Sequence, residues 1–450
     1  MLRILFPLLC ALSIVGGQAR AGMKPNIVVI MADDLGWRDL ACYGSHVFQT
    51  PNLDRLAAGG IRFTNAYSAS SVCSPTRASL MTGKYPARVG LTIWLGGKGG
   101  APSRDHLPLE ETTLAEALRG AGYATAMVGK WHLGDRPYWP KQHGFDTAVG
   151  EPHGGSPAGG YYLPNRMNLP GAKPGEYLTD RLTDEAVKVI ETNRSRPFFL
   201  YQAYHAVHTP IQGRPDLVEK HRERAAREGK SFNPSYAAMI ESLDTGVGRL
   251  MDALRANGIL ERTVVFFLSD NGGFAYSAGK KNDVTDNTPL RMGKGYCYEG
   301  GHRIPALVHY PPVVRAGTVS NEPIVTTDVY PTVLKLAGVA PMPKQHVDGV
   351  DLNPLLRDPR GKLGREAIYW HYPHPSPQGG TPSGAVRMGD WKLIEFFDDG
   401  RVELYDVAKD PGEANDLAAV SPGMTAKLRA SLKAWRQSVG AKLPDRAAPH

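Results

Sequence analysis

Two pairs of oxygen-bearing side chains follow apolar runs that lie far apart in the sequence. Asp33 and Asp34 end the stretch VVIMADD, and Asp270 and Asn271 end the stretch VVFFLSDN. The carboxyl ends of strands in an open parallel sheet line one crevice, so the four side chains can converge there. Adjacent carboxylates repel each other unless a cation lies between them, and an all-oxygen set suits Ca²⁺ or Mg²⁺. Either pair alone would fit a helix cap or a turn equally well, but the two together favour a metal site.

Five basic side chains follow other apolar runs or precede them. They are Lys130 and His132 in VGKWHLG, His208 in YHAVHTP, Lys294 in RMGKGYC and Arg77 in SPTRASL. Each of them alone would be an ordinary loop or surface residue. Together, on loops that leave the ends of strands, they predict a cationic pocket that faces the metal, as an anionic ester requires.

A lone cysteine, Cys73, stands at the start of a short helical stretch, with Pro75 in its first turn and Gly83 at its C-terminal cap. A helix N-terminus favours a bound anion, so a sulfate or phosphate is expected beside Cys73. Cys42 and Cys297 are the other cysteines outside the leader. An odd number leaves at least one thiol unpaired in an oxidising compartment. A buried structural cysteine is the usual alternative, but the spacing C-x-P-x-R favours a reactive or modified residue.

Residues 1–21 predict a signal peptide, with a basic start, an apolar run and a small-residue cleavage site. The run is shorter than the roughly 20 apolar residues that span a bilayer, so we expect an exported protein, periplasmic or secreted, with no membrane span. The formal net charge of +8 suits an anionic substrate. We do not expect nucleic acid as a partner, because no basic tract interleaved with aromatic residues is present.

Strands and helices alternate through the first three quarters of the chain. The apolar runs that fit buried strands of a parallel sheet are 26–31, 124–129, 198–204, 264–269 and 305–310. The helical patterns between them are 111–122, 182–193 and 236–258. This order predicts an α/β domain, with a large, mostly parallel sheet flanked by helices.

The pattern changes after about residue 345. Strands are expected at 367–372, 385–397 and 401–407, followed by a helix at 423–439. The sequence therefore predicts a catalytic domain at 22–345 and a small α+β subdomain with an antiparallel sheet at 346–450. Long polar segments are predicted to be loops that wall a substrate pocket, and they cover 95–106, 150–177 and 209–234.

The stretch CSPTRASLMTGKYP resembles the signature of the type I sulfatases, members of the alkaline phosphatase superfamily. Other stretches are similar to that family in order and spacing, among them PNIVVIMADDLGW, VGKWHLG, FLSDNGG, GKGYCYEGG and ELYDVAKDPGEANDLA. The resemblance covers nearly the whole chain after the leader. It implies an alkaline-phosphatase-like fold and the hydrolysis of sulfate esters.

The resemblance also implies that Cys73 is oxidised during export to Cα-formylglycine by a formylglycine-generating enzyme. The hydrated aldehyde would bind a metal ion together with Asp33, Asp34, Asp270 and Asn271, and this ion would be Ca²⁺ rather than Mg²⁺. One oxygen of the gem-diol would attack sulfur in line with the leaving alcohol.

The basic residues take roles that the resemblance implies. Arg77 and Lys130 would hold the diol, and Lys294 would hold the sulfate group. His208, helped by Lys294, would protonate the departing oxygen. His132 would take the proton of the second diol hydroxyl, so that the aldehyde re-forms and sulfate leaves.

Some residues leave alternatives open. His205 lies three residues before His208, and the family pattern, which places its histidine just before x-Pro, favours His208. His302 stands where the family usually has an aliphatic residue, and we expect no change in the chemistry. A disulfide between Cys42 and Cys297 is a further possibility.

By analogy with the family and from the expected export, the substrate is a sulfated carbohydrate. One alternative is an arylsulfatase of broad specificity, and another is a phosphate ester or phosphonate hydrolase of the same superfamily. A non-catalytic protein that binds sulfated glycans is the alternative from another class, and it would result if Cys73 were not oxidised.

Overall fold

The computed structural model describes residues 24–150, 154–164, 167 and 169–444, so the predicted signal peptide at 1–21 lies outside the described residues. Its centre is a nine-stranded sheet with the order β10-β2-β9-β6-β1-β5-β3-β4, in which β11 also pairs with β2. These strands are β1 (Asn26–Ala32), β2 (Ile61–Tyr67), β3 (Ala124–Gly129), β4 (Thr147–Val149), β5 (Phe198–Ala203), β6 (Thr263–Ser269), β9 (Arg303–His309), β10 (Thr318–Ser320) and β11 (Ile324–Val325). The α/β class and the large, mostly parallel sheet are thus confirmed.

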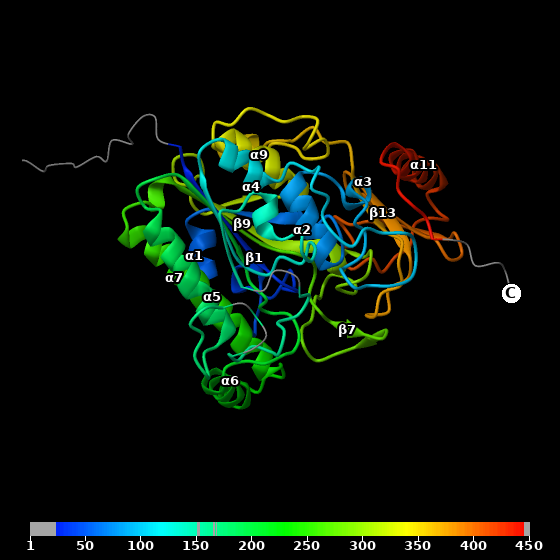
Figure 1. Ribbon diagram of the computed structural model, residues 1–450. Coiled ribbons are helices and arrows are strands. Elements are labelled where there is room, and N and C mark those ends of the chain that lie inside the picture. Colours follow the sequence, from blue (N-terminus) through cyan, green and yellow to red (C-terminus); the bar gives the residue numbers. More distant parts are fainter. Residues whose placement is uncertain (1–23, 151–153, 165–166, 168, 445–450) are drawn as a thin grey trace, which may run out of the picture.

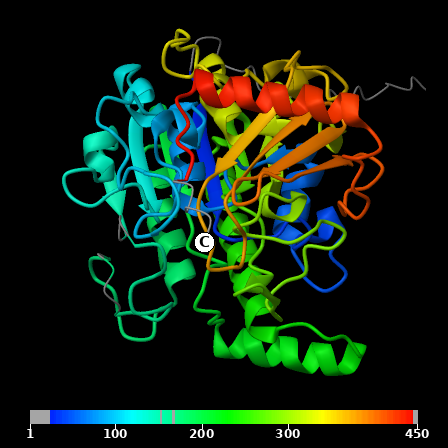
Figure 2. The same ribbon diagram turned by 90° about the vertical axis from the view of Figure 1, so that its right-hand side faces the viewer.

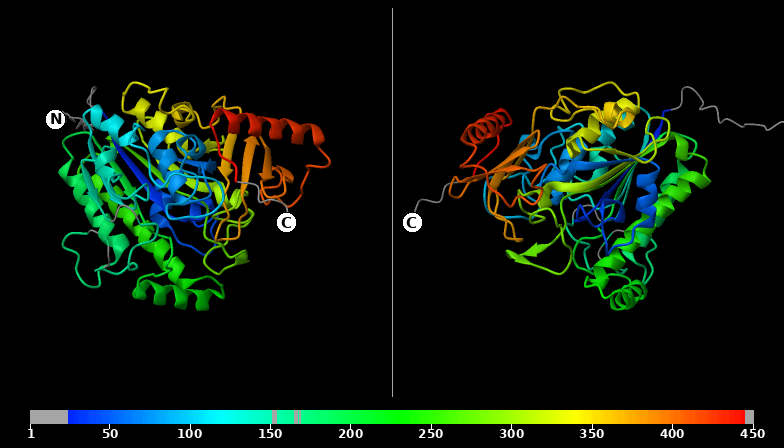
Figure 3. Two further views of the ribbon diagram at one scale, coloured as in Figure 1. Left: turned by 45° about the vertical axis from the view of Figure 1, so that its right-hand side comes forward. Right: turned by 180° about the vertical axis from the view of Figure 1, so that it is seen from behind.

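Helices cover both faces of this sheet (Figures 1 and 3). The α-helices of this part are α1 (Pro51–Ala58), α2 (Cys73–Thr82), α3 (Pro86–Val89), α4 (Leu114–Gly120), α5 (Leu178–Thr192), α6 (Pro215–Glu228), α7 (Pro234–Ala256), α8 (Glu299–His302), α9 (Val329–Leu336) and α10 (Asn353–Arg357). Single 3₁₀ turns are η1 (Ala41–Tyr43), η2 (Pro140–His143), η3 (Leu260–Arg262) and η4 (Thr326–Asp328), and a short hairpin is formed by β7 (Tyr276–Ser277) and β8 (Lys280–Lys281). Among the described residues, no helix combines the length and the apolar character that crossing a bilayer requires.

The central strand β1 explains why the sheet needs two helical layers. Its side chains alternate between the two faces, as in any strand. Val28 and Ile30 pack in one apolar cluster with α1, α5 and α7, whereas Ile27 and Val29 pack in a second cluster with α2, α4 and α9. A strand that is apolar on both faces is therefore buried on both faces.

One predicted strand runs in the opposite direction to the expectation. The run 305–310 forms β9, which pairs antiparallel with both β6 and β2. Its residues Ile304–His309 are buried on both faces. The assignment of this run to a parallel strand was therefore wrong. A continuous apolar run indicates burial on both faces, but it does not indicate the direction of the strand.

A second correction concerns the segment 209–234, which we predicted to be a long loop. It contains the helix α6, which packs against α7 and lies at the periphery of the molecule (Figure 1). Within it only His221 and Arg224 are buried, so the sequence shows no apolar stripe of helical period.

The C-terminal part forms a separate antiparallel sheet, as predicted. Its strands are β12 (Ile368–Tyr372), β13 (Ser383–Met388), β14 (Trp391–Phe396) and β15 (Val402–Asp406), and the helix α11 (Pro422–Ser438) lies across β13 and β14 (Figure 2). The expected single strand at 385–397 is a hairpin, because Gly389 adopts a left-handed φ of 60° and reverses the chain. The division of the chain between residues 345 and 346 stays a prediction.

A buried charged cluster joins the two sheets. The Lys392 ammonium on β14 lies 3.0 Å from a carboxylate oxygen of Glu299 and 3.0 Å from one of Glu413. Glu413 also accepts the backbone N–H of Glu299 at 2.7 Å, and the Tyr67 hydroxyl on β2 donates to Glu299 at 2.8 Å. All three charged side chains are fully buried, so Lys392 compensates two carboxylates that water cannot reach.

We predict that Lys392→Met lowers the free energy of unfolding by about 3–5 kcal/mol, because, among the described residues, it leaves the buried Glu413 without a cation and leaves Glu299 with only Arg303, at 3.6 Å. Urea denaturation measures this change. Lys427→Met, on an exposed position of α11, is the matched control and should leave the stability unchanged. Equal stability of the two variants would show that the cluster does not hold the sheets together.

Candidate active site

The predicted oxygen ligands lie at the carboxyl ends of two adjacent strands. β1 and β6 are parallel neighbours, with Ala32 opposite Ser269. The residues that follow this pair are Asp33 and Asp34 after β1, and Asp270 and Asn271 after β6. The register of the two strands therefore brings the two pairs of side chains together. The Asp34 N–H donates to an Asp270 carboxylate oxygen at 3.2 Å, and the Asn271 amide donates to the Asp34 carboxylate at 2.8 Å.

These residues fit a divalent cation. Asp33, Asp34, Cys73 and His208 each offer one potential ligand atom, and the four atoms lie within 4.8 Å of one another. Asp33 Oδ1 and Asn271 Oδ1 are buried, and neither has a hydrogen-bond partner among the described residues. Buried acceptors are rarely left unpaired, and carboxylate and amide oxygens are ligands that hard cations take. Asp34 also has a left-handed φ of 62°, a conformation that is unusual for a residue with a side chain and common at functional sites.

Crowding of the carboxylates changes their acidity. Burial, followed by the nearby Asp270 charge, raises the pKa of Asp33 to about 8. Burial acts in the same direction on Asp34, but the Lys294 ammonium, His208 and the Asn271 amide together outweigh it and lower the pKa of Asp34 to about 2. A divalent cation among these groups would relieve the repulsion that keeps Asp33 from ionising.

Each carboxylate faces a buried cation. Lys130 Nζ lies 2.5 Å from Asp33, and Lys294 Nζ lies 2.7 Å from Asp34. Arg77 contacts Asp270 through Nη2 at 2.7 Å and through Nε at 3.0 Å. The predicted cationic residues therefore surround the acidic residues directly instead of forming a separate wall.

Helix α2 places Cys73 in its first turn, at the edge of this cluster. It ends at Gly83, which has a left-handed φ of 67° and donates its N–H to the Ser79 carbonyl. The Arg77 guanidinium, one turn after Cys73, also donates to the Lys130 carbonyl at 3.0 Å and so fixes α2 against the end of β3. Burial raises the pKa of the Cys73 thiol despite the nearby lysines, so an unmodified thiol would stay protonated and be a weak nucleophile.

One of the three candidate histidines, His208, belongs to the charged cluster, whereas His132 and His205 do not. His208 Nε2 is 3.6 Å from Asp34, and its Nδ1 lies 2.8 Å from the Thr209 carbonyl. Burial and the Lys294 charge lower the pKa of His208 to about 3, and burial and the Lys130 charge lower the pKa of His132 well below its usual range. His205 is buried with a lowered pKa but is not part of the ligand cluster. Both His132 and His208 are therefore neutral at neutral pH before a substrate binds.

The loops that we predicted as pocket walls reach the cluster. In the described part of the segment 150–177, Ser156 Oγ lies 3.3 Å from His208 Nδ1, and a side chain at Gly155 would lie 3.1 Å from the His132 ring. In the other loop, the Leu95 N–H donates to Ser74 Oγ at 3.1 Å. Glycine-rich composition indicated a loop, but no spacing in the sequence indicated which of its residues would approach the histidines.

Some residues have roles that sequence reasoning missed or left open. The Tyr201 hydroxyl on β5 is buried and accepts a hydrogen bond from Arg77 at 3.4 Å. Because Tyr201 lies within an apolar strand pattern, nothing in the sequence indicated this contact. Cys42 and Cys297 are both free cysteines, so the possible disulfide is absent. His302 packs against the Trp370 ring at 4.9 Å, between the two sheets and outside the ligand cluster.

Comparisons with known proteins agree with this geometry. Residues 25–339 match the family model of the sulfatases, and residues 292–438 match that of the N-sulphoglucosamine sulphohydrolase C-terminal region. Human arylsulfatase A is 36% identical over 94% of this chain and 89% of its own length, and rat N-acetylgalactosamine-6-sulfatase is 37% identical over 87% and 74%. The crystal structure of Ps i-CgsB in complex with k-i-k-neocarrahexaose covers 92% of this chain and 93% of its own, with a TM-score of 0.79 and 31% identity.

The sheet, its two helical layers and the charged cluster at the strand ends define a hydrolase of the alkaline-phosphatase-like class. The chain belongs to the sulfatase family, and it is a sulfuric ester hydrolase.

We predict that a divalent cation raises the free energy of unfolding of metal-free protein by about 2.7 kcal/mol at 100 times its dissociation constant, because it would bind only the folded site. Denaturation with Ca²⁺ or with a chelator measures the increase. Asp270→Asn should reduce this increase by removing an anionic ligand. Asp358→Asn, at an exposed carboxylate, should keep it in full, and an equal response of the two variants would contradict the site.

Proposed function

We propose that this sulfatase removes sulfate from sulfated carbohydrates with formylglycine at position 73 and a Ca²⁺ ion held by residues 33, 34, 73, 270 and 271. The observation that carries the proposal is the gathering of Cys73 with buried carboxylates and His208, whose ligand atoms lie within 4.8 Å of one another. Bound Ca²⁺ would supply positive charge for the sulfate oxygens and for the hydrated residue 73.

The chain's own cations hold the charge of the reacting group. A sulfuryl group keeps negative charge on its outer oxygens throughout transfer, so positioning and electrostatics dominate, as in phosphoryl transfer. Lys294 and Lys130 are buried with their ammonium groups at Asp34 and Asp33, in a site from which water is largely excluded. We assign Lys294 to the sulfate, and Lys130 and Arg77 to the hydrated residue 73.

Formylglycine at position 73 would supply, as its gem-diol, the nucleophile and a second hydroxyl whose deprotonation releases sulfate. His208 is assigned to the proton that the leaving oxygen needs, and His132 to the proton of that second hydroxyl. Both imidazoles are neutral without substrate, and the negative charge of a bound sulfate ester raises the pKa of a histidine beside it. A bound sulfate ester therefore shifts His208 toward the protonated form that the acid role needs.

The carbohydrate class rests on the relatives and on the leader. One relative is named for N-acetylgalactosamine 6-sulfate, and a similar structure holds neocarrahexaose. The leader at 1–21 supports export to the periplasm or beyond, with oxidation of Cys73 by a formylglycine-generating enzyme on the way. A phosphate ester hydrolase is the second candidate, and faster turnover of an aryl phosphate than of the matching aryl sulfate would favour it.

We predict that Cys73→Ala lowers kcat on an aryl sulfate at least about 10³-fold, because the nucleophile is lost. Mass spectrometry of the tryptic peptide that contains residue 73 should show the aldehyde in the exported wild-type protein. Cys42→Ala, at a half-buried cysteine outside the cluster, is the matched control and should keep its activity. A peptide found only as the thiol in an active enzyme would reject the mechanism.

We predict that His208→Ala lowers kcat/KM about 10²–10⁴-fold on sugar sulfates, whose alkoxide leaving groups need a proton. The loss on 4-nitrophenyl sulfate should be much smaller, since its leaving group needs none. His205→Ala should affect both substrates equally. Equal losses on the two substrates for His208→Ala would remove this residue from the acid role.

A further inference from the structure

A groove whose charged side chains are almost all basic lies beside the C-terminal helix α11. It consists of two hollows of about 950 and 440 Å³ that share Gly440 and Lys442. The larger hollow follows α11, and the smaller one lies between the residues after α11 and the segment 87–104. We call the two together the basic groove. Its basic residues are Arg88, Arg104, Arg429, Lys433, Arg436 and Lys442.

The charges of the basic groove are not balanced within it. Glu395 is the single acidic residue of its lining, and Arg429 and Arg436 both pair with it, at 3.1 and 2.6 Å. Among the described residues, Arg104, Lys433 and Lys442 have no acidic partner within 4.0 Å. Arg88 is also paired, with Asp348 at 2.8 Å, so three of the six basic side chains lack an acidic partner and can attract an anion.

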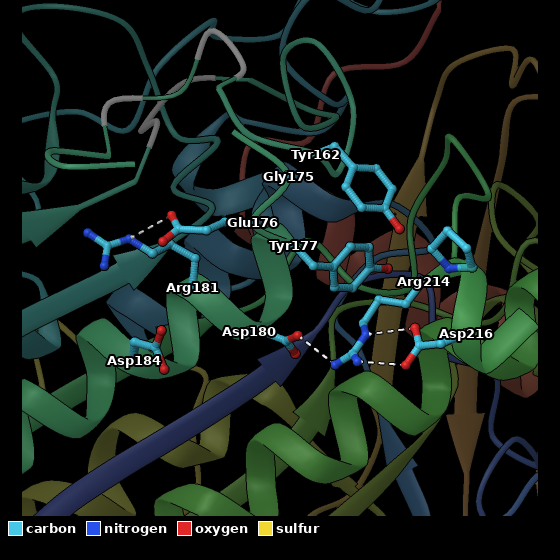
Figure 4. Close-up of a pocket in the computed structure, with 10 residues that line it drawn as sticks. Tyr162, Gly175, Glu176, Tyr177, Asp180, Arg181, Asp184, Arg214 and Asp216 are labelled. Atoms are coloured by element: carbon cyan, nitrogen blue, oxygen red, sulfur yellow. Dashed lines mark hydrogen bonds and ion pairs between the residues drawn. The ribbon is translucent and has the colours of Figure 1, made fainter. Parts of the chain in front are cut away.

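Another hollow of the molecule has the opposite character. A pocket of about 400 Å³ beside Tyr162 and Tyr177 is lined by four carboxylates and two arginines (Figure 4). There Arg214 pairs with Asp180 at 3.0 Å and with Asp216 at 2.7 Å, so its guanidinium group is already neutralised by carboxylates of the pocket. Of these two hollows, the basic groove is therefore the one whose charge suits a polyanion.

The basic groove lies near the active site along the chain and in space. Thr92 lines it, and Leu95, three residues later, donates its N–H to Ser74 beside Cys73. Three extended residues reach roughly 10 Å, so Thr92 lies within about 20 Å of Cys73. A polymer of several sugar units is longer than this distance.

The side chains around the basic groove favour one kind of polyanion over a lipid surface or a nucleic acid. The apolar side of α11, with Leu428, Leu432 and Trp435, is buried against the antiparallel sheet. The helix thus has no free apolar face to insert into a lipid surface. No aromatic side chain lines the basic groove, so it lacks the platforms on which the bases of single-stranded nucleic acids stack.

We propose that the basic groove binds the polymer part of a sulfated polysaccharide, several sugar units away from the sulfate that is removed. This proposal rests on the proposed function, because it assigns the same substrate class to a second, non-catalytic site. Its binding can nevertheless be measured without turnover.

The test compares two double variants that change the net charge equally. Lys433→Glu with Lys442→Glu alters the basic groove, and Lys335→Glu with Lys344→Glu alters exposed lysines outside it. At 0.15 M salt, the first should raise the Kd for dextran sulfate at least about tenfold, and the second less than twofold. Arg104→Glu, on the opposite wall, should weaken binding in the same direction. Unchanged melting temperatures show that the variants are folded.

Equal Kd values for the two double variants would overturn the proposal. So would unchanged dextran sulfate binding with loss of binding to phosphatidylserine vesicles or to oligo-dT, because the occupant would then be a membrane or a nucleic acid. Neutral dextran should bind no variant measurably. Turnover of an aryl sulfate by the wild-type protein tests the proposed function separately, so each idea can fail while the other stands.

Discussion

Three carboxylates gathered in a space without water are the constraint on which the rest of the structure depends. Asp33, Asp34 and Asp270 are almost fully buried, and like charges at this distance oppose one another strongly. Three buried cations, one per carboxylate, offset part of this cost. Asp33 Oδ1 and Asn271 Oδ1 have no hydrogen-bond partner among the described residues. A metal ion bound to these two oxygen atoms would offset the rest of the repulsion.

The fold meets this constraint through short, rigid connections. The parallel register of β1 and β6 sets the two acidic pairs at one level, and α2 presents residue 73 from the opposite side of the cluster. Arg77 ties α2 to both Asp270 and the Lys130 carbonyl, so the helix cannot shift without breaking the charge balance. The oxygen ligands therefore lie on the first residues after two strands, and a helix presents residue 73 to them.

Much of this arrangement could be predicted from the sequence, because strand ends in a parallel sheet have a known common edge. That rule placed Asp33 and Asp270 together although they are distant in the chain. The direction of β9 could not be predicted, since an apolar run reports burial alone. The helix α6 lacked an apolar stripe, although Pro215 at its start and Gly229 after its end were available signals. Contacts such as Ser156 with His208 depend on the path of a long loop, which no periodicity encodes.

The buried cluster of Glu299, Lys392 and Glu413 limits how this protein can diversify. Each of the three charges lies on a different segment, and a change of Lys392 removes a cation from both carboxylates at once. The C-terminal sheet is thus joined to the rest of the enzyme by buried charges. New preferences for substrates would arise more readily in connections such as the one between β12 and β13. That connection touches the catalytic part through the Pro373 carbonyl, which accepts the Ala101 N–H, and the Gln378 carbonyl, which accepts the Gly279 N–H.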